Sequence, residues 1–376
     1  MKSKFIALAL LALCSISTAC AQQYSLTDLG TLGGTGFNDF SESSGINASG
    51  VVIGDSQNAA GDDHAFTYTT AGGMVDLGSL GGPGTDSVAY GINSAGTVVG
   101  YTRNSAGTQN DAFSYSGGVM TDLGTLGGNS SNAWAINSSG TIVGDSRTGT
   151  GTRAFSYTTA GGMVNLGSLG GNLSEALAIN NSGTIAGDSI TAGGEDHAFS
   201  YTTAGGMVDL GTLGGTYSYV TGINSSGTIV GDSYGVGGAS TDHAFSYTTA
   251  GGMVDIGTLG GARSNAWAIN DLGAIVGDAN DGLGNDHAFL YVGGVMVDLN
   301  SYLDAASIAM GFELYQAYGI NDAGQISGWG VVLSTGDVHA FLLTPVPEPA
   351  SIVMLIGGLS LLGLVTRRKR EISSRI

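Results

Sequence analysis

Three short motifs recur seven times each along this chain of 376 residues, and all three share a period of roughly 45 residues. The first is Gly-Ile-Asn or Ala-Ile-Asn, with its asparagine at Asn47, Asn93, Asn137, Asn180, Asn224, Asn270 and Asn321. The second centres on a phenylalanine, at Phe66, Phe113, Phe155, Phe199, Phe245, Phe289 and Phe341. The third resembles Asp-Leu-Gly and begins at Asp28, Asp76, Asp122, Asn165, Asp209, Asp255 and Asp298. Such a period predicts repeated units that bury their apolar faces against neighbouring units.

The segment from Ala133 to Leu166 shows how one repeat forms four short strands, at 133–136, 141–144, 154–158 and 163–166. Between the first two strands lies a turn that starts at Asn137 and ends at Gly140. Asparagine suits the start because its side chain can bond back to the backbone, and glycine supplies a positive φ. Four short strands in roughly 45 residues are typical of one blade of a β-propeller.

The position of the chain ends within the repeat favours a closed ring. The chain after the leader starts with a fourth strand, 24–29, and ends with the first three strands of a seventh unit, 315–321, 325–328 and 339–342. A ring gains from this split, because the N-terminal strand completes the last unit and joins the two ends. The sequence therefore predicts an all-β, seven-bladed β-propeller of four-stranded blades over residues 22–344. A β-solenoid is the alternative.

Many of the 67 glycines also keep the repeat. One stands inside each second strand: Gly54, Gly100, Gly144, Gly187, Gly231, Gly277 and Gly328. A glycine within a strand indicates a bulge or a close backbone approach, which we expect at the tight central channel of a propeller. The segment Ser301–Glu313 interrupts the last repeat and is expected to form a short helical or irregular excursion.

The N-terminus has the pattern of a signal peptide over residues 1–21. Two lysines precede an apolar stretch, and Ala19 and Ala21 form a small-residue cleavage site. The alternative is a lipoprotein signal acylated at Cys20. Cleavage after Ala21 would remove both cysteines, Cys14 and Cys20, so that no disulfide remains in the exported chain.

The C-terminus has a second targeting pattern over residues 345–376. Its parts are a proline-rich stretch, an apolar segment at 351–365 and the basic cluster Arg367, Arg368, Lys369 and Arg370. Fifteen helical residues extend about 22 Å, which is short of the roughly 30 Å of a bilayer core. We therefore expect a transmembrane sorting helix with its charges on the cytoplasmic side. An ordinary membrane anchor is the alternative.

This tail resembles the PEP-CTERM sorting domain, with the family's Pro-Glu-Pro at Pro347, Glu348 and Pro349. The resemblance implies an inner-membrane-tethered precursor that an exosortase processes, and an association with exopolysaccharide or biofilm matrix. The repeats, over residues 24–343, resemble HAF extracellular repeats. Their His-Ala-Phe motif stands at His64, His197, His243, His287 and His339. No enzymatic activity comes with this resemblance.

Between residues 22 and 345 the chain has 28 acidic and four basic residues, a formal charge of −24. This balance argues against nucleic-acid binding, because phosphate contacts need Lys and Arg. No nucleophile elbow, HExxH or P-loop motif occurs. The five histidines share one repeat position, so we expect them to form structural hydrogen bonds and not to bind metal.

Aspartates follow the second strands and precede the histidines, flanking a loop of variable length. In the richest of these loops, Asp278, Asn280, Asp281 and Asp286 suggest a calcium site, although solvated turns explain the same composition. Apart from calcium, the sequence indicates no cofactor.

Unit-specific residues are the better place to look for a binding site. Trp134 and Trp267 stand in first strands and Trp329 in a second strand. Exposed tryptophans stack on sugars, but the sequence favours core packing for the first two. The overall expectation is an exported non-enzymatic surface or matrix protein. A secreted polysaccharide hydrolase or lyase and a calcium-dependent adhesin are the alternatives.

Overall fold

The computed structural model describes residues 22–34, 40–103, 108–235 and 242–347. The predicted signal residues Ala19 and Ala21 lie outside these ranges, as does the apolar segment 351–365. The same holds for these residues of the sorting tail: Glu348, Pro349, Arg367, Arg368, Lys369 and Arg370. None of the helices in the described ranges is long and apolar enough to cross a membrane.

The described residues form 28 strands, which fall into four classes by their place in the repeat. The first strands are β2 (Ser41–Ile46), β6 (Ser87–Ile92), β10 (Ser131–Ile136), β14 (Gly170–Ile179), β18 (Gly214–Ile223), β22 (Gly260–Ile269) and β26 (Phe312–Ile320). The second strands are β3 (Val52–Gln57), β7 (Val98–Arg103), β11 (Ile142–Thr148), β15 (Ile185–Thr191), β19 (Ile229–Gly235), β23 (Ile275–Asp281) and β27 (Ile326–Val332). The third strands are β4 (Asp63–Thr69), β8 (Asn110–Ser116), β12 (Gly151–Thr158), β16 (Asp196–Thr202), β20 (Asp242–Thr248), β24 (Asp286–Val292) and β28 (Asp337–Pro345). The fourth strands are β5 (Gly73–Asp76), β9 (Val119–Asp122), β13 (Gly162–Asn165), β17 (Gly206–Asp209), β21 (Gly252–Asp255), β25 (Val295–Asp298) and β1 (Tyr24–Asp28).

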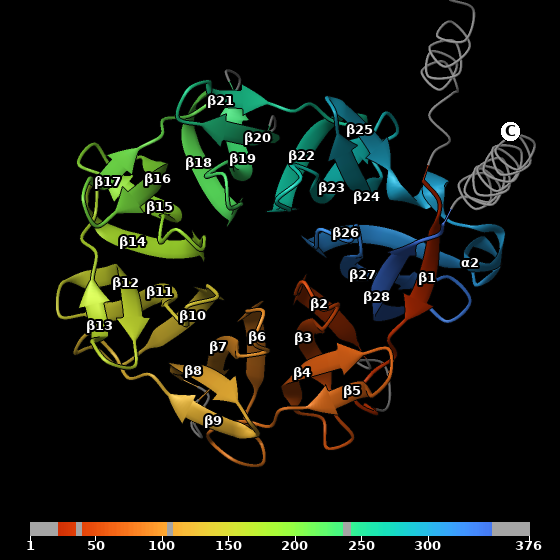
Figure 1. The fold of residues 1–376 in the computed structure, drawn as a ribbon, viewed down its shortest axis with the longest axis horizontal. Coiled ribbons are helices and arrows are strands. Elements are labelled where there is room, and N and C mark those ends of the chain that lie inside the picture. Colours follow the sequence, from red (N-terminus) through yellow and green to blue (C-terminus); the bar gives the residue numbers. More distant parts are fainter. Residues whose placement is uncertain (1–21, 35–39, 104–107, 236–241, 348–376) are drawn as a thin grey trace, which may run out of the picture.

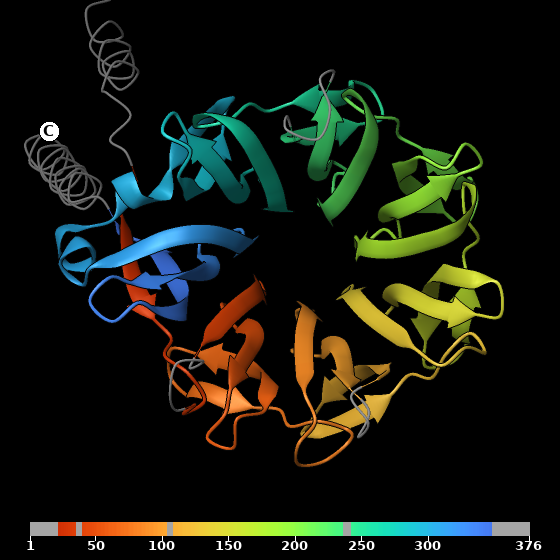
Figure 2. The ribbon, with the colours of Figure 1, turned by 180° about the vertical axis from the view of Figure 1, so that it is seen from behind.

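Each unit is an antiparallel sheet of four strands in sequence order, and we number the units 1 to 7 from β2 onward. Units 4 and 5 are joined by one parallel bridge between Asp196 and Tyr217. In unit 7 the order is β26-β27-β28-β1, so the N-terminal strand pairs with the C-terminal one. The prediction of an all-β chain built from four-stranded sheets is confirmed. Figures 1 and 2 show the sheets arranged around a common centre, first strands inside and fourth strands at the rim.

The insertion before β26 forms the 3-10 helix η2 (Leu299–Tyr302) and the short helix α2 (Ala305–Ala309), as predicted. Asp304 caps α2 by accepting a hydrogen bond from the Ser307 N–H. The hydroxyl of Ser307 in turn accepts a hydrogen bond from the Leu26 N–H at 2.8 Å. The insertion therefore helps to hold β1 in place.

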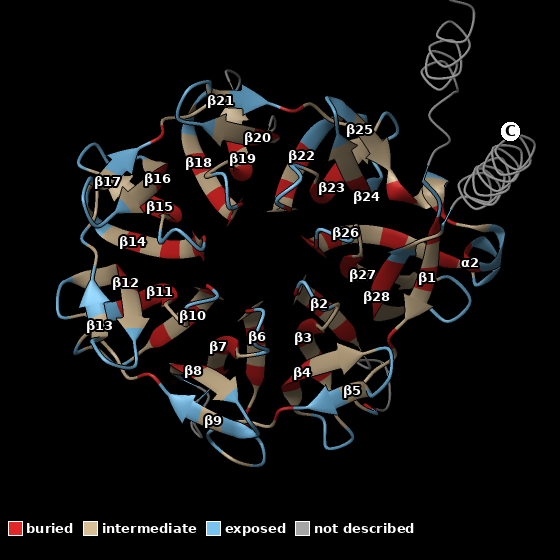
Figure 3. Ribbon diagram, in the orientation of Figure 1, coloured by how far each residue is buried: buried red, intermediate tan, exposed pale blue. Residues whose placement is uncertain are grey.

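The apolar cores lie between adjacent sheets. All seven repeat phenylalanines are fully buried, and each packs against residues of the preceding unit. In the core between units 7 and 1, for example, Phe66 packs with Leu29, Ala340 and Leu342. Burial falls toward the rim, where the fourth strands are mainly exposed (Figure 3). Each unit therefore needs a neighbour to bury its aromatic ring.

The glycine inside each second strand faces a bulge of the first strand. A Cβ at any of these glycines would lie 1.8–2.0 Å from a first-strand carbonyl oxygen, for example that of Glu42 at Gly54. The register of the first strand shifts at this point, between Ser43 and Gly45 in unit 1. The predicted bulge and close approach are confirmed. The approach is within one sheet, however, and not across the central channel as the sequence suggested.

The repeat asparagine links consecutive units. Its Oδ1 accepts hydrogen bonds from its own turn, as predicted; at Asn47 these come from the N–H groups of Ser49 and Val51. Its Nδ2 donates to the carbonyl oxygen of the next unit's asparagine, at 3.1–3.3 Å, and the series returns from Asn321 to Asn47. A buried serine in the first strands of six units adds a second link: Ser41, Ser87, Ser131, Ser174, Ser218 and Ser264. Each accepts a hydrogen bond from an alanine N–H of the preceding unit.

Candidate binding site

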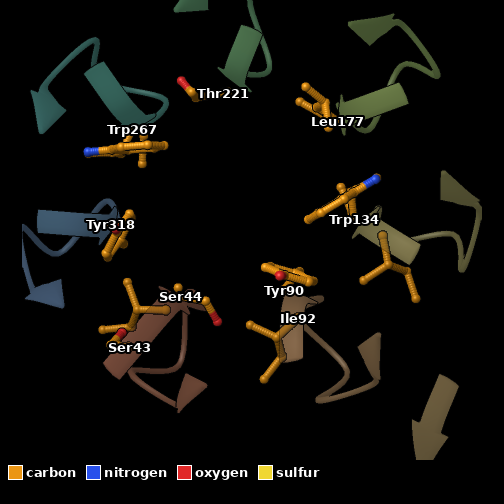
Figure 4. Close-up of a pocket in the computed structure, with 18 of the residues that line it drawn as sticks. Ser43, Ser44, Tyr90, Ile92, Trp134, Leu177, Thr221, Trp267 and Tyr318 are labelled. Carbon is orange, nitrogen blue, oxygen red and sulfur yellow. The ribbon is translucent and has the colours of Figure 1, made fainter. Parts of the chain in front are cut away.

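One position in each first strand departs from the repeat, and these departures gather at the centre of the molecule. The position directly precedes the Gly-Ile-Asn or Ala-Ile-Asn motif. It holds Ser44, Tyr90, Trp134, Leu177, Thr221, Trp267 and Tyr318. All seven residues line one cavity of about 640 Å³ (Figure 4). Because the backbone repeats and this position does not, the walls of the cavity differ from unit to unit.

Two pairs of aromatic rings face the cavity. The ring centroids of Tyr90 and Trp134 are 4.3 Å apart with an interplanar angle of 49°, and those of Trp267 and Tyr318 are 4.9 Å apart at 56°. Figure 4 shows the two pairs on opposite sides of the cavity, separated by smaller residues. Aromatic walls with a few convergent polar groups are typical of small-molecule sites.

Both tryptophans are held by buried carboxylates. The indole Nε1 of Trp134 donates to Oδ1 of Asp145 at 2.7 Å, and Asn132 donates to the same carboxylate. In unit 6, Trp267 donates to Asp278 in the same way. Burial raises the pKa of both aspartates, and these hydrogen bonds partly offset the effect. The indole rings are therefore fixed in orientation before any ligand binds.

Two sequence expectations about these residues are wrong. The aspartates do not follow the second strands but lie inside them, because pairing with the third strand continues beyond the glycine; Asp145, for example, pairs with Ala154. They are therefore mainly buried and do not flank the loops. The tryptophans do not pack in the apolar cores either, since the bulge directs Trp134 and Trp267 to the half-buried wall of the cavity.

Unit 1 opens the cavity to two carboxyl groups. The small side chain of Ser44 stands where other units have larger residues, and Glu42 and Asp55 contribute to the wall beside it. These two acids are direct cross-strand partners. Burial first, and then the charges of Glu42, Asp63 and Asp86, raise the pKa of Asp55 to about 7. Burial also raises the pKa of Glu42.

Equivalent acids in units 4 and 5 lie behind the wall. Burial raises the pKa of Glu175 and of Asp232 to about 7, with contributions from neighbouring carboxylates. Asp188 is fully enclosed and its pKa is raised well above its usual range, also by burial first. Its Oδ1 accepts a hydrogen bond from the Val220 N–H of the next unit. Five of the seven units thus have an aspartate at this second-strand position, and units 2 and 7 have Tyr101 and Trp329. Glu42 and Asp55 are the two acids that line the cavity.

The five histidines lie near the rim, away from the cavity. In each of their units the histidine Nδ1 donates to the aspartate that ends the fourth strand, for example His64 to Asp76 at 2.8 Å. The other pairs are His197–Asp209, His243–Asp255, His287–Asp298 and His339–Asp28. Unit 3 lacks both partners, having Arg153 and Asn165 in their places. The pairs link the third strand to the fourth, and in unit 7 the pair His339–Asp28 links β28 to β1.

The four residues suggested for calcium point to different partners. Asp278 accepts a hydrogen bond from Trp267 beside the cavity, and Asn280 donates one to Asp286 across the hairpin. Asp281 caps the turn by accepting from the N–H groups of Leu283 and Asn285. Within the described ranges, no group of three or more His, Cys, Asp or Glu side chains is placed to hold one metal ion.

The cavity was missed because the variable residues of its wall share no residue type. The signal that reveals it is the alignment of the repeats: directly before a motif that varies little, one position holds serine, tyrosine, tryptophan, leucine and threonine. Such variation in an otherwise strict repeat marks the place where the units differ in role. The sequence analysis named two members of the set, Trp134 and Trp267, but did not group them with Tyr90 and Tyr318.

A family model for the PEP-CTERM protein-sorting motif matches residues 345–370. The chain therefore carries this motif at its C-terminus, as the resemblance implied. The motif identifies an exported protein that an exosortase processes and that passes through a membrane-anchored precursor. No curated protein matches the chain in sequence.

Several solved structures match the chain at low identity. A puromycin hydrolase matches with a TM-score of 0.52 and 10% identity, over 85% of this chain and 57% of the hydrolase. TolB from Acinetobacter baumannii matches with a TM-score of 0.48 and 10% identity, over 80% of this chain and 65% of TolB. A gluconolactonase from Xanthomonas campestris matches with a TM-score of 0.43 and 10% identity, over 88% and 94% of the two chains. The hydrolase likeness supports a β-propeller fold and does not extend to activity.

Proposed function

We propose that this protein is an exported, non-enzymatic carbohydrate-binding protein of the cell surface or extracellular matrix, built as a closed seven-bladed β-propeller of HAF-type repeats. Its ligand is a chain of sugars, and its site is the central cavity. The observation that carries this proposal is the pair of aromatic walls, because the aromatic residues occur at a variable repeat position that lines the cavity in all seven units.

The chemistry of the wall suits sugars. Sugar rings offer apolar C–H faces and polar edges, and a site for them needs flat aromatic surfaces beside hydrogen-bonding groups. The cavity provides both, with two aromatic pairs and with Ser44, Thr221 and two carboxyl groups. Export and exosortase processing bring the protein to the compartment where extracellular polysaccharides accumulate. The proposed partner is therefore an exopolysaccharide or another matrix glycan.

Closure of the ring is supported by the contacts of β1. Leu26 is 6% exposed and pairs with Leu343 on β28, whereas Val75 on the equivalent strand of unit 1 is 49% exposed. We expect Leu26→Asp to lower the free energy of unfolding by about 3 kcal/mol, because it buries a charge in an apolar contact. Val75→Asp should change it by less than about 0.5 kcal/mol. Urea denaturation of both variants measures the difference.

Equal effects of the two substitutions would contradict closure. In an open chain of repeats, a terminal strand contributes little to the cooperative unit, and Leu26→Asp would then be as mild as the exposed control. Small-angle scattering of the unaltered protein provides an independent measurement, since a closed propeller is compact and a solenoid is elongated.

Glycan binding is tested with an array of bacterial and synthetic oligosaccharides, followed by calorimetry on the best ligand. Replacing Trp134 or Trp267 with alanine should weaken binding at least about tenfold, since stacking on one aromatic ring contributes roughly 1–2 kcal/mol. Trp329→Ala is the matched control. Trp329 stacks on Tyr315 at 5.5 Å and is not part of the cavity wall.

Two results would overturn the proposal. Absence of binding to every glycan tested would exclude carbohydrate recognition by the unaltered protein. Cleavage of a bound glycan into products would instead support the hydrolase or lyase alternative, for which the paired acids Glu42 and Asp55 are the place to begin. Calcium dependence of binding, removed by a chelator, would support the adhesin alternative.

A further inference from the structure

The charge of the cavity restricts which sugars it can accept. Among the described residues that form its wall, Glu42 and Asp55 are the charged ones, and none is Lys, Arg or His. The surrounding chain adds to this field, with 28 acidic and four basic residues between positions 22 and 345. An acidic polysaccharide would meet like charges throughout, whereas a cation is attracted to the cavity.

The two acids of unit 1 differ from the equivalent acids of the other units because they line the cavity. In units 3 and 6 the aspartate at this place faces an asparagine and also accepts from a tryptophan. In unit 1 the aspartate faces Glu42, a second acid. Unit 4 has the same kind of pair, Glu175 and Asp188, but neither of those acids is in the wall. The serine at position 44 supplies no indole N–H. The tryptophan-bearing units therefore use their carboxylates to fix the wall, and unit 1 presents its carboxyl groups to the cavity.

The acids lie close to both aromatic pairs. After burial, the charge of Asp55 is among the causes that raise the pKa of Tyr90, one member of the first pair. The pKa of Tyr318, in the second pair, is raised to about 12 by burial, with further contributions from Glu42 and Asp55. Figure 4 likewise places Ser43 and Ser44 between Tyr90 and Tyr318. A group held at the acids is thus flanked by rings on both sides.

A buried hydroxyl on the same strand has no partner in the protein. Ser43 is 1% exposed and belongs to the cavity wall, and its Oγ makes no hydrogen bond to any of the described residues. At this position the other units have alanine or valine: Ala89, Ala133, Ala176, Val220, Ala266 and Ala317. Unit 1 therefore has two small hydroxyl side chains, Ser43 and Ser44, on the side of the cavity where Glu42 lies.

We propose that the cavity binds oligosaccharides of hexosamines with free amino groups, with the ammonium group at Glu42 and Asp55 and the sugar rings on the two aromatic pairs. This inference rests on the proposed function and adds the chemical class of the sugar. The ammonium relieves the repulsion between two buried acids, and the adjacent rings favour the cation through their π faces. An N-acetylated sugar has the same shape without the charge.

Proton release gives a direct signature of this arrangement. Because burial first, and neighbouring charge second, raise the pKa of Asp55 to about 7, the free site holds a proton at mildly acidic pH. An ammonium favours the ionised acids, so binding at about pH 6 should release up to about one proton per site. Calorimetry in two buffers of different ionisation enthalpy measures that number.

The test compares three hexasaccharides on the full exported protein by calorimetry at about pH 6: β-1,4-linked glucosamine, its fully N-acetylated form and an oligouronate. We expect the amino form to bind at least about tenfold more tightly than the N-acetylated form, with proton release, and the uronate not to bind. Glu42→Gln combined with Asp55→Asn should abolish the preference and the proton release. Glu175→Gln is the matched control, because Glu175 occupies the equivalent strand position of Glu42 but is not in the wall.

Each outcome decides between the two proposals. Equal binding of the amino and N-acetylated forms, or a preference that survives in the double variant, overturns the amino-sugar inference and leaves carbohydrate binding intact. Failure of all sugars, here and on the array, overturns the proposed function itself. Thermal unfolding of the double variant verifies that it is folded, and removal of two buried acids should leave it at least as stable as the unaltered protein.

Discussion

Raising the pH from about 4.5 to 8 is expected to destabilise the protein by several kcal/mol. Burial first, and neighbouring carboxylates second, raise the pKa of Asp55, Glu175 and Asp232 to about 7. In the unfolded chain such groups ionise near pH 4. Between these values the folded state binds more protons than the unfolded state, so the free energy of unfolding falls as the pH rises. Urea denaturation at intervals across this range measures the profile.

A matched pair of substitutions isolates the buried acids. Asp232→Asn should flatten the profile and stabilise the protein at pH 8, because the neutral amide keeps the state that burial favours. Asp122→Asn should change nothing, since Asp122 is exposed and unit 3 already has Asn165 in its place. A free energy of unfolding that stays constant or increases between about pH 5 and 7 would contradict the raised pKa values.

Replacing Gly231 with alanine is expected to lower the free energy of unfolding by at least about 3 kcal/mol. The added Cβ would lie 1.8 Å from the carbonyl oxygen of Tyr219 and 3.0 Å from the ring of Phe245. Neither neighbour can move freely, since the carbonyl belongs to the bulge of β18 and Phe245 fills the core between units 4 and 5. The strands would have to separate where they are most tightly paired.

The control for this prediction is another glycine. Gly149 lies in an exposed hairpin with ordinary φ, and nothing stands within 4 Å of its Cβ position. Gly149→Ala should therefore be neutral or slightly stabilising, because alanine reduces the freedom of the unfolded chain. Thermal or urea unfolding of the two variants gives the comparison. A mild effect at Gly231 would mean that the bulge can be repaired by a small shift of the first strand.

Much of the fold could be predicted because each repeat encodes it locally. The turn asparagines, the buried phenylalanines and the strand glycines each act within a few residues or across one strand pair, and the structure confirms their local roles. The second strands were placed too short at 141–144, since pairing along β11 continues to Thr148. This error moved Asp145 into a loop and hid its contact with Trp134.

The cavity could not be predicted from the same local rules. The variable residues of its wall come one from each unit, separated by 43 to 51 positions in the chain, and no short motif records such a set. The bulge decides which side chain turns inward, and bulges depend on pairing with the neighbouring strand. Only when the first strands meet at the hub do Tyr90 and Trp134 become one surface.

The sequence alone determined the repeating strand pattern, the point in the repeat at which the pattern starts and stops, and the export tail, because these depend on local spacing and composition. The tertiary structure decided which contacts form between the repeats. It turned the Nδ2 of Asn321 to the carbonyl oxygen of Asn47, and it paired β1 with β28 across the whole length of the chain. It also gathered the variable residue that precedes the Gly-Ile-Asn or Ala-Ile-Asn motif of each unit around a common cavity. Contacts between units that are distant in the sequence form only when each sheet buries its aromatic core against the next sheet. No single repeat encodes that arrangement.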